Sequence, residues 1–135
     1  MSAFVPAVIL FEKSPRWEAE LKRRLADGAL RVRPCRSSAD ALELCRQAPG
    51  SALVVDLAAN AAEVLQLLDA LLKLRLPVRP IVIAPLEAGE LEWPTREFGA
   101  TAFVSDRIGG DALARTCRQA LAGSNAWRNG TLGRK

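Results

Sequence analysis

The chain has 135 residues, the size of one ordinary domain, and half of them are apolar, which excludes a disordered chain. No apolar run approaches the roughly 20 residues of a membrane-spanning helix. The net charge of +4 is concentrated near the end, because residues 123–135 hold three of the 19 bases and none of the 15 acids, so the rest of the chain is nearly neutral and a nucleic-acid partner is unlikely.

The first half of the chain alternates between predicted strands and helices. Residues 7–11 form an unbroken apolar run, typical of a strand buried on both faces. Ser14 and Pro15 predict the start of a helix. Residues 30–35 alternate apolar residues with arginine and include a proline, which predicts an edge strand, and Ser38 is expected to cap a second helix. The positions expected to be buried on these helices are Trp17, Leu21, Leu25, Ala41, Leu42 and Cys45.

The second half continues the alternation. Asn60 and Glu63 resemble a capping box at the start of a long helix, and Asp111 is expected to cap the last one. Residues 86–95 predict only a weak helix, because a glycine and a proline interrupt them. Strands are predicted at 52–57, 81–84 and 101–105. The helix positions expected to face inward are Val64, Leu67, Leu68, Leu71, Leu72, Leu113, Cys117 and Leu121.

This alternation predicts an α/β fold with a doubly wound parallel sheet and helices on both faces. Residues 1–122 are expected to form the domain, and residues 123–135 a flexible basic tail or linker. Function in such sheets gathers at the carboxyl ends of the strands. We therefore expect Glu12 and Asp56 to face each other across one crevice.

Several functional classes are excluded or disfavoured by what the sequence lacks. It has no histidine, which removes histidine-based nucleophile pairs, phosphohistidine transfer and histidine metal ligands. The turn after residue 11 contains no glycine, so a nucleotide-binding loop is not expected. The start of the chain lacks the features of a signal peptide, and the three cysteines form no CxxC pair. Buried thiols in a reducing cytoplasm are the favoured reading of Cys35, Cys45 and Cys117.

Three motifs resemble the receiver domain of response regulators, over roughly residues 5–122. "FEKSP" stands where that family carries two acids after the first strand, "LVVDL" places Asp56 where the phosphoacceptor aspartate ends the third, and "GATAFVSDR" puts Phe103 at the aromatic switch position. The resemblance implies a flavodoxin-like sheet of five strands ordered 2-1-3-4-5, with edge strands at 30–35 and 101–105. It also implies a bacterial protein of two-component phosphorelay signalling.

The departures from the family pattern concern the pocket. The acid pair becomes Glu12-Lys13, and the hydroxyl residue ending the fourth strand becomes Pro85, or Ala84 if the alignment shifts by one. The lysine that ends the fifth strand becomes Asp106. An aspartyl phosphate normally has its charge offset by Mg²⁺, a hydroxyl and a lysine. Mg²⁺ would keep only Glu12 and Asp56, so we expect weak binding at most.

These substitutions predict a degenerate receiver that is not an enzyme and needs no cofactor. We expect Lys13 to pair with Asp56 and to replace the charge of the metal. Function would then be phosphorylation-independent contact with a protein partner or a fused output domain, with a homodimer possible. The contact surface would include Trp93 and Phe103, in the region of 86–98, strand 101–105 and the last helix, unless Trp93 packs inward and Phe103 only fills space. The alternative is a phosphoacceptor receiver, phosphorylated at Asp56 with Mg²⁺ as cofactor.

Overall fold

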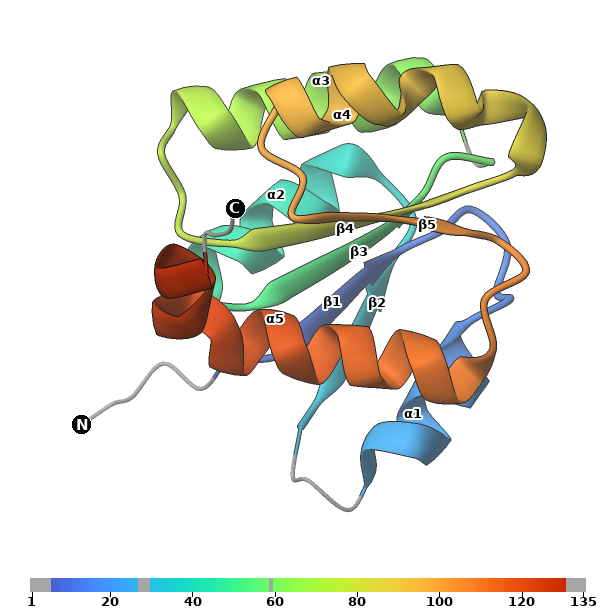
Figure 1. The fold of residues 1–135 in the computed structure, drawn as a ribbon, viewed down its shortest axis with the longest axis vertical. Helices are drawn as coiled ribbons and strands as arrows, with labels where there is room; N and C mark the ends of the chain where they lie inside the picture. The colour runs from blue at the N-terminus through green and yellow to red at the C-terminus, as the bar shows by residue number, and fades with distance from the viewer. Residues whose placement is uncertain (1–5, 27–29, 59, 131–135) are drawn as a thin grey trace.

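A parallel sheet of five strands forms the centre of the molecule (Figure 1). The computed structural model describes residues 6–26, 30–58 and 60–130, with residues 123–130 as backbone only. The strand order is β2-β1-β3-β4-β5, as predicted, with β2 and β5 at the edges. The strands are β1 (Val8–Phe11), β2 (Val32–Cys35), β3 (Ala52–Asp56), β4 (Arg79–Ala84) and β5 (Ala102–Ser105).

Helices cover both faces of the sheet (Figure 1). On one face lie α2 (Ser38–Gln47), α3 (Ala61–Lys73), the 3-10 helix η2 (Leu86–Leu91) and α4 (Glu92–Glu97), and on the other lie α1 (Glu18–Leu25) and α5 (Gly110–Gly130). Each face has its own apolar core, and β1 and β3 supply alternate side chains to both, as strands buried on two faces must. Within the described ranges, none of the helices combines the length and apolar character that crossing a membrane requires.

The predicted helix starts need three corrections. The last helix begins at Gly110, so Asp111 lies inside its first turn and does not cap it as predicted. The first helix does not start at Ser14 and Pro15 but at Glu18, because the carboxylate of Glu12 accepts the first amides and no serine caps them. The second helix is capped by Ser37, one residue earlier than predicted, through a hydrogen bond from the Asp40 amide.

The second half of the chain follows the prediction more closely. Asn60 caps α3 by accepting from the Glu63 amide. Leu72 is a correction, since its side chain is 49% exposed and not inward-facing. Pro94 does not break α4, because it lies in the first turn, where a missing amide costs no helical hydrogen bond.

The end of the last helix also differs from the prediction. The backbone of α5 stays helical to Gly130 and therefore passes Gly123, where the domain was expected to end. Residues 131–135 lie outside the described residues. The division into a domain of residues 1–122 and a basic tail or linker of 123–135 stays a prediction.

Candidate functional site

Glu12 lies at the carboxyl end of β1 and is buried, with 1% of its surface exposed. Its Oε1 accepts hydrogen bonds from the amides of Arg16 at 3.0 Å and Trp17 at 3.1 Å, and its Oε2 accepts from the Glu18 amide at 3.2 Å. The Trp17 amide also reaches Oε2 at 3.3 Å. These amides are the ones that an α-helix leaves without internal partners at its start. The carboxylate therefore caps α1, and both of its oxygens are engaged.

Lys13 is directed away from the predicted partner. Its Nζ lies 2.9 Å from Oε1 of Glu63 at the start of α3, and it donates to the main-chain oxygen of Arg36 at 2.9 Å. The predicted pair with Asp56 is therefore wrong. Lys13 lies in the bend after β1, where its Nζ is 5.5 Å from the centroid of the Phe11 ring, whose side chain packs in the core on the α2–α3 side of the sheet.

Glu63 has a second partner besides Lys13. Its Oε2 accepts from the Ser38 amide at 3.0 Å, so this carboxylate joins the starts of α2 and α3. The Lys13 ammonium and the Ser38 amide hold the pKa of the Glu63 carboxyl below its ordinary value. The sequence indicated only that Glu63 follows Asn60 at capping-box spacing, and its role at the pocket was missed.

Asp56 ends β3 one strand away from Glu12 and is 6% exposed. Because Phe11 is opposite Val55 in the parallel register, Glu12 and Asp56 lie level with each other, whereas the crevice predicted between them stays a prediction. Oδ1 of Asp56 accepts from the Ala58 amide at 2.9 Å. Among the described residues no hydrogen bond to Oδ2 is present, so one carboxylate oxygen keeps an open lone pair for chemistry or for water.

Among the described residues, no side chain at the ends of β4 and β5 makes a hydrogen bond or an ion pair with Asp56. Ala84 is buried and lies opposite Ser105, and Pro85 precedes η2. The Ser105 hydroxyl instead accepts from the Arg107 amide at 3.0 Å. Two of the predicted pocket residues, Pro85 and Asp106, therefore follow the ends of their strands, as expected, and neither donates a side-chain hydrogen bond.

Asp106 has a partner that the sequence analysis missed. Arg16 donates to the main-chain oxygen of Asp106 at 2.7 Å, and its guanidinium lies 3.7 Å from the Asp106 carboxylate. The same guanidinium stacks on Trp17, with 4.8 Å to the ring centroid. Arg16 was the one base in "SPRW", but the sequence could not show that it reaches a residue 90 positions away.

The residues present do not fit a magnesium site. Mg²⁺ requires carboxylate oxygens that are free to enter an octahedral shell. Glu12 uses both oxygens on amides, Lys13 puts a cation where the second acid would be, and Asp56 offers one oxygen. The described residues also contain no cluster of three or more acidic, cysteine or histidine side chains suited to a metal ion. The predicted weak binding by Glu12 and Asp56 has not been tested and stays a prediction.

The predicted contact surface contains one exposed and one partly buried aromatic side chain. Trp93, on α4, is 70% exposed and lines a shallow hollow with Gly89, Glu90, Glu92 and Arg96. The possibility that it packs inward is therefore wrong. Phe103 is partly buried on β5 and packs against the core between the sheet and the α2–α4 layer. Phe103 thus fills space beside the strand as one reading expected, and a contact of Phe103 or Trp93 with a partner stays a prediction.

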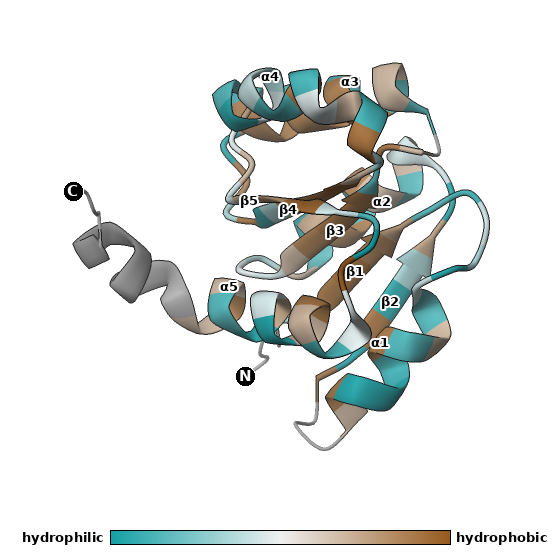
Figure 2. Cartoon of the chain, turned by 45° about the vertical axis from the view of Figure 1, so that its right-hand side comes forward, coloured by the Kyte–Doolittle hydropathy of each residue, from teal (hydrophilic) through white to brown (hydrophobic). Residues whose placement is uncertain are grey.

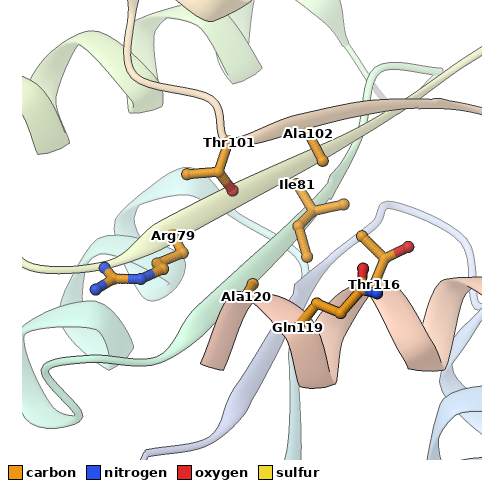
Figure 3. Close-up of a pocket in the computed structure, with 7 residues that line it drawn as sticks. All are labelled: Arg79, Ile81, Thr101, Ala102, Thr116, Gln119 and Ala120. Atoms are coloured by element: carbon orange, nitrogen blue, oxygen red, sulfur yellow. The ribbon is translucent and has the colours of Figure 1, made fainter. Parts of the chain in front are cut away.

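A separate cavity lies between the sheet and α5 (Figure 3). Figure 3 shows the Arg79 guanidinium at one end of it and Thr116 at the other. Its two threonine hydroxyls already donate to main-chain oxygens, Thr101 to Pro80 and Thr116 to Ala112. The cavity opens near the start of β4 and not at the carboxyl ends of the strands, so it is not part of the candidate site.

The three cysteines are buried and unpaired, as predicted. Burial raises the pKa of Cys35 to about 11 and those of Cys45 and Cys117 to about 12. Such thiols are poor nucleophiles at neutral pH, and they belong to the core rather than to a site.

Solved structures of receiver domains have the same fold as this chain. The signal receiver domain of a protein described as a LuxO repressor from Vibrio parahaemolyticus superposes with a TM-score of 0.78 at 18% identity, covering 91% of this chain and 95% of that one. A CheY-like receiver domain from Methanospirillum hungatei gives a TM-score of 0.74 at 15% identity, over 87% and 94% of the two chains. Full-length FixJ from B. japonicum gives 0.77 at 13% identity and covers 93% of this chain but 63% of FixJ.

The sequence itself matches no protein-family model and no curated protein. At the identities above, the likeness establishes the fold, which is the receiver-domain fold of response regulators that the motifs indicated.

Proposed function

We propose that the chain is a degenerate receiver module of two-component signal transduction, which acts in the cytoplasm by phosphorylation-independent binding of a protein partner or a fused output domain. One observation carries this proposal. Glu12, which replaces the family's first pocket acid, is bound by three amides at the start of α1 and is no longer available as a metal ligand. The carboxylate has become part of the scaffold.

The surroundings of Asp56 support the same conclusion. A phosphoryl group on Asp56 would need cations and donors to offset its charge. Lys13 is held by Glu63 and Arg36, and Ala84 has no donor in its side chain. Asp106 adds a negative charge at the end of β5, and Arg16 already pairs with it. No group in this set is left to report phosphorylation to β5, so the module is held in one state and binds constitutively.

The surface available for binding is centred on Trp93. An exposed tryptophan surrounded by polar residues is the usual form of an interface anchor. Leu86, at the start of η2, is 71% exposed and is a second exposed apolar side chain of the same segment. Binding through these side chains requires no enzyme activity and no cofactor, and it does not involve nucleic acid.

Two measurements test the proposal. The first is intact mass after incubation with acetyl phosphate and Mg²⁺, in which we expect no phosphoryl adduct. The second is capture of partners from the native organism, in which Trp93→Ala should lose the partner and Asp56→Ala should keep it. The reverse pattern, with binding lost in Asp56→Ala and kept in a folded Trp93→Ala variant, would show that the proposal is wrong.

A second candidate function rests on Asp56 itself, as a phosphoacceptor in a phosphorelay. The observation that favours it is the free Oδ2 of a carboxylate at the carboxyl end of β3. Under this alternative the mass experiment gives an adduct that Asp56→Asn abolishes and that depends on Mg²⁺. Calorimetry with Mg²⁺ on the wild type, Asp56→Asn and Lys13→Asp then shows whether restoring the second acid also restores metal affinity.

A further inference from the structure

Two surfaces of opposite charge lie at opposite edges of the sheet. The first, here called the acidic face, covers η2 and α4 next to β5 and consists of Leu86, Glu87, Glu90, Glu92, Trp93 and Glu97. The second, here called the basic edge, borders a groove along β2 and consists of Lys22, Arg31, Val32, Arg33, Pro34 and Leu44. Residues 86–97 hold four glutamates and one arginine, a net charge of −3, whereas residues 30–36 hold three arginines and no acid, a net charge of +3.

The acidic face has charges without internal partners. Glu92 pairs with Arg96 at 2.9 Å, but among the described residues Glu87, Glu90 and Glu97 have no ion pair. All of these glutamates are exposed, and in the sequence they alternate with the two most exposed large apolar side chains of the described chain, Leu86 and Trp93. The face therefore combines exposed apolar and acidic side chains.

The basic edge has the complementary composition. Arg31 and Arg33 have no ion pair within the described ranges, and Lys22 pairs only with Glu18 of its own helix. Leu30, Val32 and Leu44 supply apolar lining to the groove between the arginines. Asp40 and Glu43 line a neighbouring hollow that shares Pro34 and Leu44 with this groove, so two exposed acids border the basic edge on its α2 side.

The two surfaces cannot meet within one molecule. The acidic face is beside β5 and the basic edge is beside β2, which are the two outer strands of the sheet (Figure 2). Their complementary charges therefore stay unsatisfied in a single copy but could be satisfied between two.

We infer that this chain associates head to tail with a second copy of itself, the acidic face of one copy docking on the basic edge of the next. The inference rests on the proposed function, because it names the partner of the Trp93 surface. Trp93 would enter the groove, where Arg31 and Arg33 can stack on the indole ring, and Glu87 and Glu90 would face the guanidinium groups. Such a contact is heterologous, so each docked pair keeps one free surface of each kind and can add further copies.

The contact should use side chains and not strand addition. In the β1–β2 ladder, the Val8 amide donates to the main-chain oxygen of Arg31 and the Glu12 amide donates to that of Cys35. The odd-numbered residues of β2 therefore direct their main-chain hydrogen-bonding groups toward β1, and the even-numbered residues direct theirs away from the sheet. The outward position between Val32 and Arg36 is Pro34, which has no amide to donate. An added strand would lose that hydrogen bond, whereas a helical surface such as η2 and α4 would not need it.

Sedimentation velocity of the full chain tests the inference. We expect the mean mass to rise with protein concentration at about 0.05 M salt and to fall at about 0.5 M salt, where the charges are screened. Arg31→Glu with Arg33→Glu should weaken association by about tenfold or more, since it places like charges opposite the glutamates. The matched control is Arg46→Glu with Arg115→Glu, which makes the same change in net charge on exposed residues outside both surfaces and should associate as the wild type does.

A mixing experiment determines the geometry. Trp93→Ala keeps the basic edge, and the Arg31→Glu, Arg33→Glu variant keeps the acidic face, so neither should self-associate but their mixture should form a complex that stops at two copies. The inference is overturned if the wild type stays monomeric at low salt. It is also overturned if the wild type stops at two copies and the two variants form no complex when they are mixed. In either case, loss of a captured partner in Trp93→Ala would leave the proposed function standing, and retention of that partner would refute the proposed function independently.

Discussion

Replacing Glu12 by alanine should destabilise the protein although it removes a buried negative charge next to another carboxylate. The change leaves three amides at the start of α1 without their acceptor, those of Arg16, Trp17 and Glu18. An unsatisfied buried donor costs about 1–3 kcal/mol, and water can reach some of these amides once the side chain is gone. We therefore expect a loss of about 3 kcal/mol, a substantial part of the roughly 5–15 kcal/mol that stabilises a domain.

Glu12→Gln should be milder. The amide oxygen of glutamine can replace Oε1 and keep the bonds from Arg16 and Trp17, but its NH₂ group would oppose the Glu18 amide. One hydrogen bond and the negative charge are lost, so we expect about 1–2 kcal/mol. Lys13→Ala is the control at the neighbouring position. Its ion pair is partly exposed and screened by solvent, so its loss should cost much less than the loss of Glu12.

The assay is urea unfolding in the absence of Mg²⁺, followed by far-ultraviolet circular dichroism, which does not depend on the environment of the tryptophans. If Glu12 were instead a metal ligand held near Asp56, removing it without metal present would relieve repulsion between two acids and raise stability. A Glu12→Ala variant as stable as the wild type, or more stable, would refute the assignment of Glu12 as the cap of α1.

Three further outcomes follow from the fold. At pH 8 the three cysteine thiols should react with a disulfide reagent only as fast as the chain unfolds, and reaction of the native protein at the rate of a free thiol would contradict this. Burial raises the thiol pKa to about 11 for Cys35 and about 12 for Cys45 and Cys117. The stability that the buried thiols contribute should therefore be full below the ordinary thiol pKa and be lost as pH rises toward these folded values. Gly99→Ala should cost roughly 1–2 kcal/mol in urea unfolding, because φ is +96° there while an added Cβ would meet Leu72 only at ordinary contact distance, and Gly89→Ala, in open space, is the control. Glu63→Gln should flatten the decline of the free energy of unfolding in acid. The lowered pKa of the Glu63 carboxyl stabilises the fold above the ordinary carboxyl pKa, and this contribution is lost as pH falls through the folded value. If the free energy of unfolding depends on pH in the same way in the variant and the wild type, the result would count against the Lys13–Glu63 pair.

The fold was predictable because its main signals are local. Apolar runs that end in acids, a proline in an arginine-bearing strand and an asparagine before an apolar helix each determine their element within a few residues. The end of α4 at Gly99, whose φ is +96° and whose amide donates to the oxygen of Arg96, was not predicted. Glu12 and Asp56 follow or end adjacent parallel strands, so their position at the same height in the sheet could be predicted from the strand order.

The site was less predictable because its contacts are set by side-chain direction and by distant elements. A lysine at the end of the first strand suggested a pair with Asp56, but Glu63 at the start of α3 and the main-chain oxygen of Arg36 hold Lys13 instead. Helix-start propensity favoured Ser14, although a carboxylate two residues earlier could satisfy more amides. The Arg16–Asp106 pair joins loops whose proximity depends on the packing of α1 against α5, which no local pattern encodes.

The Arg16–Asp106 contact has a consequence for local opening of the structure. It ties the loop after β1 to the loop after β5, and the Asp106 amide is bonded in turn to the oxygen of Ala84. Separation of the β5 end from β4 should therefore disturb the start of α1 as well. Amide hydrogen exchange at Asp106 and at Trp17 should then report one shared opening event, and Arg16→Ala should divide it into two with different rates.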